Sequence, residues 1–173
     1  MILIEQQEII KNVVKEFFDK ATIVVDISTT EIQEESASSA DAPKRREENE
    51  KESFRMNIET ELPQLLIGEN GQTLSEIQHL LRLILRKKIG PDIYFDLDIN
   101  GYKKKKTSYL EELAKTIADE VVLTRQEKEL LPMPAQDRRI IHLSLSQRTD
   151  VVSESKGQEP NRCVLIRPKE LSI

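Results

Sequence analysis

The segment Leu66-Ile67-Gly68-Glu69-Asn70-Gly71-Gln72-Thr73-Leu74 places two glycines three positions apart, between apolar residues and at the start of a long helical pattern. Glycine adopts backbone conformations closed to other residues and lets the main chain approach a ligand closely. Thr73 and Glu76 have the spacing of a capping box, which predicts that Thr73 caps the following helix. A helix N-terminus offers unpaired N–H groups to an anion. The segment therefore favours a turn suited to a sugar-phosphate backbone, although glycines at this spacing also occur in plain turns.

Hydrophobic periodicity around this segment predicts the order helix, strand, strand, short helix, helix, strand. The helices are expected at 5–20, 62–67 and 73–88, and the strands at 21–27, 54–58 and 93–99. A sheet covered by helices on one face would bury both apolar sets. Residues 34–51 are Ser/Ala-rich and then highly charged, with no apolar period, which predicts a mobile loop. Within it, Lys44-Arg45-Arg46 is interpreted as a solvated charge cluster.

The C-terminal part predicts a second small unit of helices and strands. A helix is expected at 103–125, a short extended piece at 130–131, a second helix at 132–147 with Pro134 in its first turn, and strands at 149–155 and 162–167. The second helix should bury Ile140, Ile141, Leu143 and Leu145. The fold class is therefore α+β, with domains at 1–101 and 102–168 and a tail at 169–173.

Composition excludes several classes of function. The net charge is −5, but residues 102–173 carry 14 Lys+Arg against 11 Asp+Glu, so the basic excess lies in the C-terminal part. The lone Cys163, expected to be buried, excludes an internal disulfide and a cysteine-based zinc site. With two histidines and no glycine-rich P-loop, the sequence predicts no enzyme, cofactor, metal site or small-molecule substrate. No stretch has the roughly 20 apolar residues of a membrane helix, which predicts a soluble cytoplasmic protein.

Two groups of cations are candidates for phosphate contacts. The run Lys103, Lys104, Lys105 and Lys106 opens the first helix of the second unit. Arg138 and His142 lie four apart and should share an exposed helix face, beside Arg139. An exposed Arg and His hydrogen-bond phosphate and sugar oxygens, which positions a nucleic acid rather than reading its sequence. In both groups a solvated helix surface is the alternative interpretation, as it is for Arg82, Arg86, Lys87 and Lys88.

These segments resemble two known domains. The order αββααβ, with the glycine pair between two helices, is similar to a type II KH domain, a three-stranded sheet with helices on one face. Residues 132–143 and the hairpin at 153–162 resemble the R-three-H domain, a small sheet with two helices, as it appears in the bacterial Jag family. There a KH domain directly precedes an R-three-H domain. The resemblance covers roughly 9–168, and the family's separate N-terminal Jag domain has no counterpart in this sequence.

The resemblance implies a set of RNA-binding residues. KH domains clamp a nucleic-acid backbone with the GXXG loop, which here is Gly68, Glu69, Asn70 and Gly71, with Ile67 and Leu74 lining the adjacent groove. The sequence departs from the family because Glu69-Asn70 stands where a basic residue is common, and a carboxylate there repels phosphate. Lys103 to Lys106 would extend the phosphate contacts toward Arg138, Arg139 and His142.

Jag-type proteins are RNA-binding regulators, so the resemblance implies a single-stranded RNA-binding protein, an RNA chaperone or a post-transcriptional regulator. It also implies links to cell-envelope growth, cell shape and the membrane insertase, and a small single-KH partner protein. Two alternatives stay open. The chain acts as a protein–protein adaptor that uses the KH fold as an interaction module, or it binds single-stranded DNA.

Overall fold

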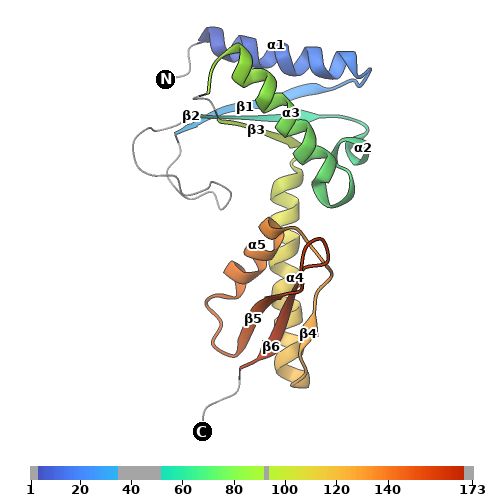
Figure 1. The fold of residues 1–173 in the computed structure, drawn as a ribbon, viewed down its shortest axis with the longest axis vertical. Helices are drawn as coiled ribbons and strands as arrows, with labels where there is room; N and C mark the ends of the chain where they lie inside the picture. The colour runs from blue at the N-terminus through green and yellow to red at the C-terminus, as the bar shows by residue number, and fades with distance from the viewer. Residues whose placement is uncertain (1–3, 35–51, 92–93, 170–173) are drawn as a thin grey trace. The chain divides into compact units, whose positions relative to one another are not determined.

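The structure, a computed structural model, describes residues 4–34, 52–91 and 94–169 (Figure 1). The chain forms two compact units, the first reaching Lys103 and the second beginning at Lys104. The loop predicted at 34–51, with Lys44-Arg45-Arg46, lies outside the described residues except for Glu34, which ends a strand.

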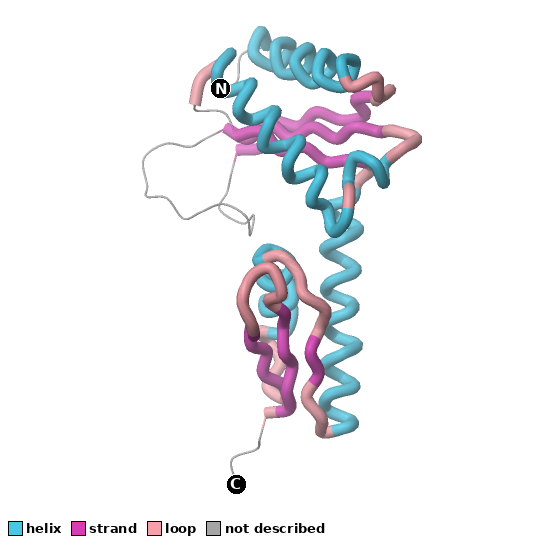
Figure 2. Tube along the Cα trace, turned by 45° about the vertical axis from the view of Figure 1, so that its right-hand side comes forward, coloured by secondary structure: helices cyan, strands magenta, loops and turns pink. Residues whose placement is uncertain are grey.

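The N-terminal unit has the predicted element order. It consists of α1 (Ile4–Lys20), β1 (Asp26–Glu34), β2 (Glu52–Glu59), α2 (Pro63–Ile67), a 3₁₀ turn η1 (Glu69–Gly71), α3 (Gln72–Lys88) and β3 (Tyr94–Ile99). The sheet order is β1-β2-β3, with β1 antiparallel and β3 parallel to β2. Helices α1 and α3 cover one face of this sheet (Figures 1 and 2). The prediction of a three-stranded sheet with helices on one face is therefore confirmed.

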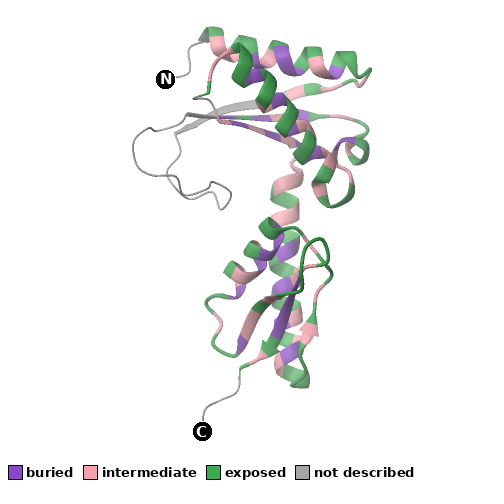
Figure 3. Cartoon of the chain, in the orientation of Figure 1, coloured by how far each residue is buried: buried purple, intermediate pink, exposed green. Residues whose placement is uncertain are grey.

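Alternation along two neighbouring strands builds the core of this unit. Phe54, Met56 and Ile58 of β2 are buried and pair in register with the buried Phe95, Leu97 and Ile99 of β3. Opposite them, α1 contributes Ile10, Val14 and Phe18, and α3 contributes Leu74, Leu81 and Leu85. Figure 3 shows the buried residues recurring along β2 and β3. The sheet face and the two helix stripes thus share one apolar layer.

The first strand begins later than predicted. The β-branched stretch at 21–27 indicated a strand, but β1 starts at Asp26. Thr22 adopts a positive φ of 59°, and Ile23 donates its N–H to the Phe18 carbonyl, so the chain turns here instead of pairing. Ile23 and Val25 still pack against the core, whereas Val24 is 84% exposed. The apolar residues Ile23 and Val25 therefore belong to a connecting segment that packs against the core, and not to a paired strand.

The predicted capping box at α3 is wrong. Gly71 is the N-cap, and no side chain caps the helix. Thr73 lies inside the first turn, and Glu76 accepts a hydrogen bond from Gln72 Nε2 at 3.0 Å. Thr73 instead packs against Gly68, where its hydroxyl fills the space that a Cβ would need. Thr73 and Glu76 have the spacing of a capping box, but Thr73 packs against the turn and does not cap the helix.

The C-terminal unit is a small sheet with two helices, as predicted. It contains α4 (Tyr102–Thr124) from Lys104 onward, β4 (Lys128–Glu129), α5 (Ala135–Leu145), β5 (Val151–Lys156) and β6 (Cys163–Pro168). The strand order is β4-β6-β5, with both pairings antiparallel. Its core joins Leu110, Ala114, Ala118 and Val121 of α4 to Ile141, Leu145, Val164 and Ile166. Cys163 is buried, as expected.

The inward face of α5 differs from the prediction. Pro134 precedes the helix as its N-cap rather than lying in the first turn. Leu143, expected in the core, is 64% exposed, and Ile140 is only partly buried. The stripe that faces the core runs through Arg138, Ile141 and Leu145, spaced three and four apart. Arg138 is therefore buried on the inner face of α5, whereas Leu143, which the pattern placed there, is exposed.

We predict that Gly68→Ala lowers the free energy of unfolding by about 3 kcal/mol, from backbone strain and steric overlap. At Gly68, φ is +70°, and a Cβ would lie 2.1 Å from Thr73 Oγ1 and 2.7 Å from Thr73 Cβ, so rotation of the Thr73 side chain gives no relief. Urea denaturation followed by circular dichroism measures the loss. Gly101→Ala is the control, because φ there is +66° with no atom within 4 Å, and it should cost about 1 kcal/mol. Equal losses would show that the contact with Thr73 is unimportant.

Candidate nucleic-acid interface

The glycine turn between α2 and α3 depends on both glycines. Gly68 has φ 70° and ψ −173°, a region essentially restricted to glycine, and Gly71 is left-handed at φ 84° and ψ 15°. Asn70 between them is also left-handed, at φ 52° and ψ 18°. Tyr102 packs on Gly71, where a Cβ would lie 3.0 Å from the ring. The turn is therefore held from two sides, by Thr73 at its first glycine and by Tyr102 at its second.

The exposed surface of this turn is smaller and less apolar than predicted. Glu69 and Asn70 are exposed, and Ile67 is half-buried against the core. Leu74, expected to line a groove, is only 3% exposed and belongs to the core, so that prediction is wrong. Leu74 follows the glycines by one helical turn and faces the sheet with Leu81 and Leu85. An exposed apolar residue close to the turn is Leu65 of α2, at 62%, which the sequence reasoning missed.

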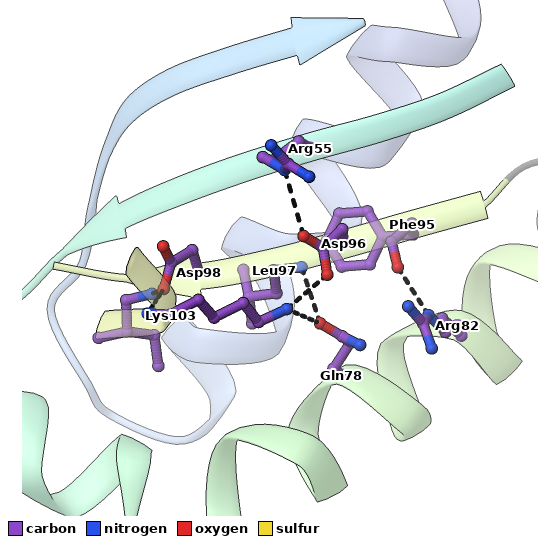
Figure 4. Close-up of polar contacts among 9 residues, drawn as sticks. Arg55, Gln78, Arg82, Phe95, Asp96, Leu97, Asp98 and Lys103 are labelled. Atoms are coloured by element: carbon purple, nitrogen blue, oxygen red, sulfur yellow. Dashed lines mark hydrogen bonds and ion pairs between the residues drawn. The ribbon is translucent and has the colours of Figure 1, made fainter. Parts of the chain in front are cut away.

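Side chains of α3 close the free edge of β3 (Figure 4). Gln78 Oε1 accepts the Leu97 N–H at 3.0 Å, and Arg82 Nε donates to the Phe95 carbonyl at 2.6 Å. The Arg82 guanidinium also lies 4.3 Å from the ring centroid of Tyr94. These contacts replace the ladder partner that an edge strand lacks. A solvated helix surface was one interpretation of Arg82, but the structure shows that Arg82 and Gln78 contact the edge of the sheet.

The lysine run has two partly buried members at its ends and two exposed members between them. Lys103 donates through Nζ to Gln78 Oε1 at 2.8 Å and pairs with Asp96, while its backbone N–H bonds to Asp98. Figure 4 shows Lys103 reaching this group beside β3. Within the second unit, Lys106 pairs with the buried Asp137 at 2.6 Å. Lys104 and Lys105 are exposed. The outer two lysines of the run thus serve ion pairs inside their own units, and the inner two face solvent.

Arg138 is buried, which contradicts the expectation of an exposed Arg. Its side chain is only 7% exposed. Nε donates to the Met133 carbonyl at 3.2 Å, and Nη2 pairs with the Glu159 carboxylate in the turn between β5 and β6. The reason is its place on the stripe of α5 that faces the sheet. Arg139, the next residue, is exposed.

His142 is half-buried between α5 and β5. Its Nδ1 lies 2.8 Å from Ser153 Oγ and its Nε2 lies 2.9 Å from Ser155 Oγ. Burial and then the nearby positive charge of Arg138 lower the pKa of His142, so the neutral ring is favoured. A neutral ring has one donor and one acceptor nitrogen, which suits two hydroxyls. Sequence reasoning noted the hairpin but missed these serines. The available signal was that Val151, Ser153 and Ser155 are two residues apart, which places all three on the same face of the strand.

The described part of the chain shows neither a metal site nor a membrane-spanning helix. Within residues 4–34, 52–91 and 94–169, no group of three or more His, Cys, Asp or Glu side chains is arranged to hold a metal ion. None of the helices described there combines the length and the apolar composition needed to cross a membrane.

Comparison with known families and proteins identifies the second unit. The family model of the R-three-H domain matches residues 108–168. The C-terminal unit is an R-three-H domain.

Curated proteins named RNA-binding protein KhpB are similar to the chain. The protein from Clostridium symbiosum is 39% identical over 122 residues, which is 70% of this chain and 54% of that protein. The one from Bacillus subtilis strain 168 is 35% identical over 121 residues, or 69% of this chain and 58% of the relative.

The similarity to KhpB is not confined to the R-three-H domain. The 122 matched residues exceed the length of either unit, so the match extends through parts of both. The chain is therefore similar to KhpB proteins over parts of both units, in agreement with the resemblance to the Jag family. It spans about half the length of these curated relatives, and 34% of the one from Lactiplantibacillus plantarum.

We predict that acidification destabilises the R-three-H domain through His142. Its pKa is lowered in the folded state, so the unfolded chain, with an ordinary pKa near 6.5, takes up the proton first. This contribution to stability is complete above about pH 6.5 and is lost as the pH falls from there through the lowered pKa of the folded state. Urea unfolding between about pH 8 and pH 5.5 measures the slope.

His142→Gln should flatten that pH dependence, whereas His79→Gln, at the exposed second histidine, should preserve it. Equal pH slopes in the wild type and in His142→Gln would contradict the assignment.

Proposed function

We propose that the chain binds single-stranded RNA through the glycine turn of its N-terminal unit and through its R-three-H domain. The observation that carries the proposal is the glycine turn itself, set between two helices in a unit of αββααβ order. Similarity to proteins named RNA-binding protein KhpB supports RNA as the ligand. We further propose that residues 1–101 form a type II KH domain, that 102–168 are the R-three-H domain with 169–173 as a tail, and that the chain works in the cytoplasm without a catalytic step.

Backbone groups and solvent-facing cations would supply the affinity. The turn lacks a Cβ at two of its four positions, so a phosphodiester could approach its main chain closely. Lys104 and Arg139 are exposed, and no ion pair is found for either within the described residues. Binding of this kind releases counterions and weakens as salt increases. Glu69, exposed on the turn, opposes it by repulsion.

A protein-binding role is the second candidate, and the outer face of α3 favours it. Leu80, Leu83 and Ile84 are 49%, 51% and 36% exposed and lie three and four apart on one side of the helix. Such a strip suits docking of another protein. The resemblance to the Jag family points to a small single-KH partner, and further to cell-envelope growth, cell shape and a link with the membrane insertase.

We predict that Glu69→Lys strengthens RNA binding by up to about thirtyfold, because it changes the charge near a phosphate by two units, each worth about 1 kcal/mol in water. Fluorescence anisotropy with a labelled single-stranded RNA, measured over a series of salt concentrations, gives the Kd. Glu8→Lys, at an exposed position of α1, changes the net charge equally and should have a smaller effect. Equal gains, or no binding by the wild-type chain, would refute the role of the turn. Competition with DNA of the same sequence tests selectivity, since only RNA offers the 2′-OH.

We predict that Leu83→Glu removes co-purifying protein but not co-purifying nucleic acid, because it puts a charge into the apolar strip. The chain is isolated from cells, and its 260 nm absorbance and protein bands are compared with the wild type. Leu143→Glu, at a 64% exposed leucine of α5, is the control. Loss of nucleic acid together with protein would instead favour one shared surface.

A further inference from the structure

The ion pair between Arg138 and Glu159 joins a buried cation to an exposed anion. The Arg138 side chain is 7% exposed, whereas the Glu159 side chain is 59% exposed. Arg138 is fixed in place, since its Nε bonds to the Met133 carbonyl and its Cα lies in α5. Glu159 belongs to the turn between β5 and β6. A buried guanidinium without an anionic partner is costly, whereas this exposed carboxylate is readily hydrated outside the pair.

The nearest residue of α5 one turn from this pair is a histidine with hydrogen-bonding neighbours. One turn along α5 from Arg138 lies His142, whose lowered pKa favours the neutral ring. Its two nitrogens meet Ser153 and Ser155 of β5. The neighbouring acid Asp137 is directed to Lys106 of α4. Glu159 is therefore the negative charge that the structure pairs with Arg138, in a setting of hydroxyl and imidazole groups that suits phosphate oxygens.

A carboxylate and a phosphate accept hydrogen bonds from a guanidinium in similar geometry. We propose that Glu159 occupies the phosphate position of the R-three-H domain, so that a nucleic-acid phosphate binds Arg138 by displacing this carboxylate. The exchange leaves Arg138 paired at every stage, and only the exposed partner changes. This inference rests on the proposed RNA binding and adds an internal competitor to it. It also explains how a buried Arg serves as a ligand-binding residue.

The binding test compares two neutralising variants of the same hairpin. Glu159→Gln removes the competitor, and Glu154→Gln removes an exposed carboxylate of β5 that pairs with Arg167. Both change the net charge by the same amount. We expect Glu159→Gln to tighten binding of a labelled single-stranded RNA about fivefold relative to Glu154→Gln. The gain should disappear when Arg138→Gln is added. Equal affinities of the two single variants, or a gain that persists without Arg138, would overturn the inference.

A second measurement separates this inference from RNA binding as such. Inorganic phosphate is titrated into the full chain while the Arg138 Nε–H signal is followed by NMR. We expect a saturable shift at lower phosphate concentration in Glu159→Gln than in the wild type and in Glu154→Gln. That shift would support the site even if the wild type bound no RNA, whereas RNA binding with identical phosphate titrations would overturn it. If Glu159→Gln does not fold, Glu159→Asp, which shortens the reach of the carboxylate, should give an intermediate shift, and none would count against the site.

Discussion

The close approach of Thr73 to Gly68 is the constraint on which the N-terminal unit depends. With the Thr73 hydroxyl in the place of a Cβ, the chain leaves α2 in a conformation that only glycine adopts without strain and enters α3 at a fixed angle. That angle directs Leu74, Leu81 and Leu85 to the sheet. A side chain at position 68 would therefore disturb the core as well as the turn, because the glycine that shapes the turn also orients the helix.

The same helix also protects the sheet. Because β3 is an edge strand, its outer N–H and C=O groups need partners. Gln78 and Arg82 supply them from α3, and Lys103 joins the group through Gln78 and Asp96 (Figure 4). In sequence, these residues read as the polar face of an amphipathic helix. Only the three-dimensional arrangement shows that these side chains hydrogen-bond the main chain of the edge strand instead of pointing to solvent.

Hydrophobic spacing was enough to predict most elements, because β2, β3, α1 and α3 bury clean apolar stripes. It failed where a polar residue takes an inward position. Arg138 lies on the stripe of Ile141 and Leu145, so its burial was readable from spacing alone, but its charge suggested exposure. Leu143 was misplaced for the opposite reason, since an apolar residue was assumed to be inside. The contacts of His142 with Ser153 and Ser155 join residues ten or more apart, which no local pattern specifies.

Two adjacent residues of α5 carry opposite buried charges, and their partners differ in a way that matters for function. Asp137 pairs with Lys106, which is 20% exposed and comes from a long helix of the same unit. Arg138 pairs with Glu159, which is 59% exposed and comes from a turn. Breaking the first pair would leave the buried Asp137 carboxylate without its cation, which is costly because that carboxylate is hardly exposed to water. The second pair offers a cation whose partner returns to water at little cost, provided that another anion takes its place. The Asp137–Lys106 pair thus holds this turn of α5 in place, and it keeps the Arg138 guanidinium in position while its partner is exchanged.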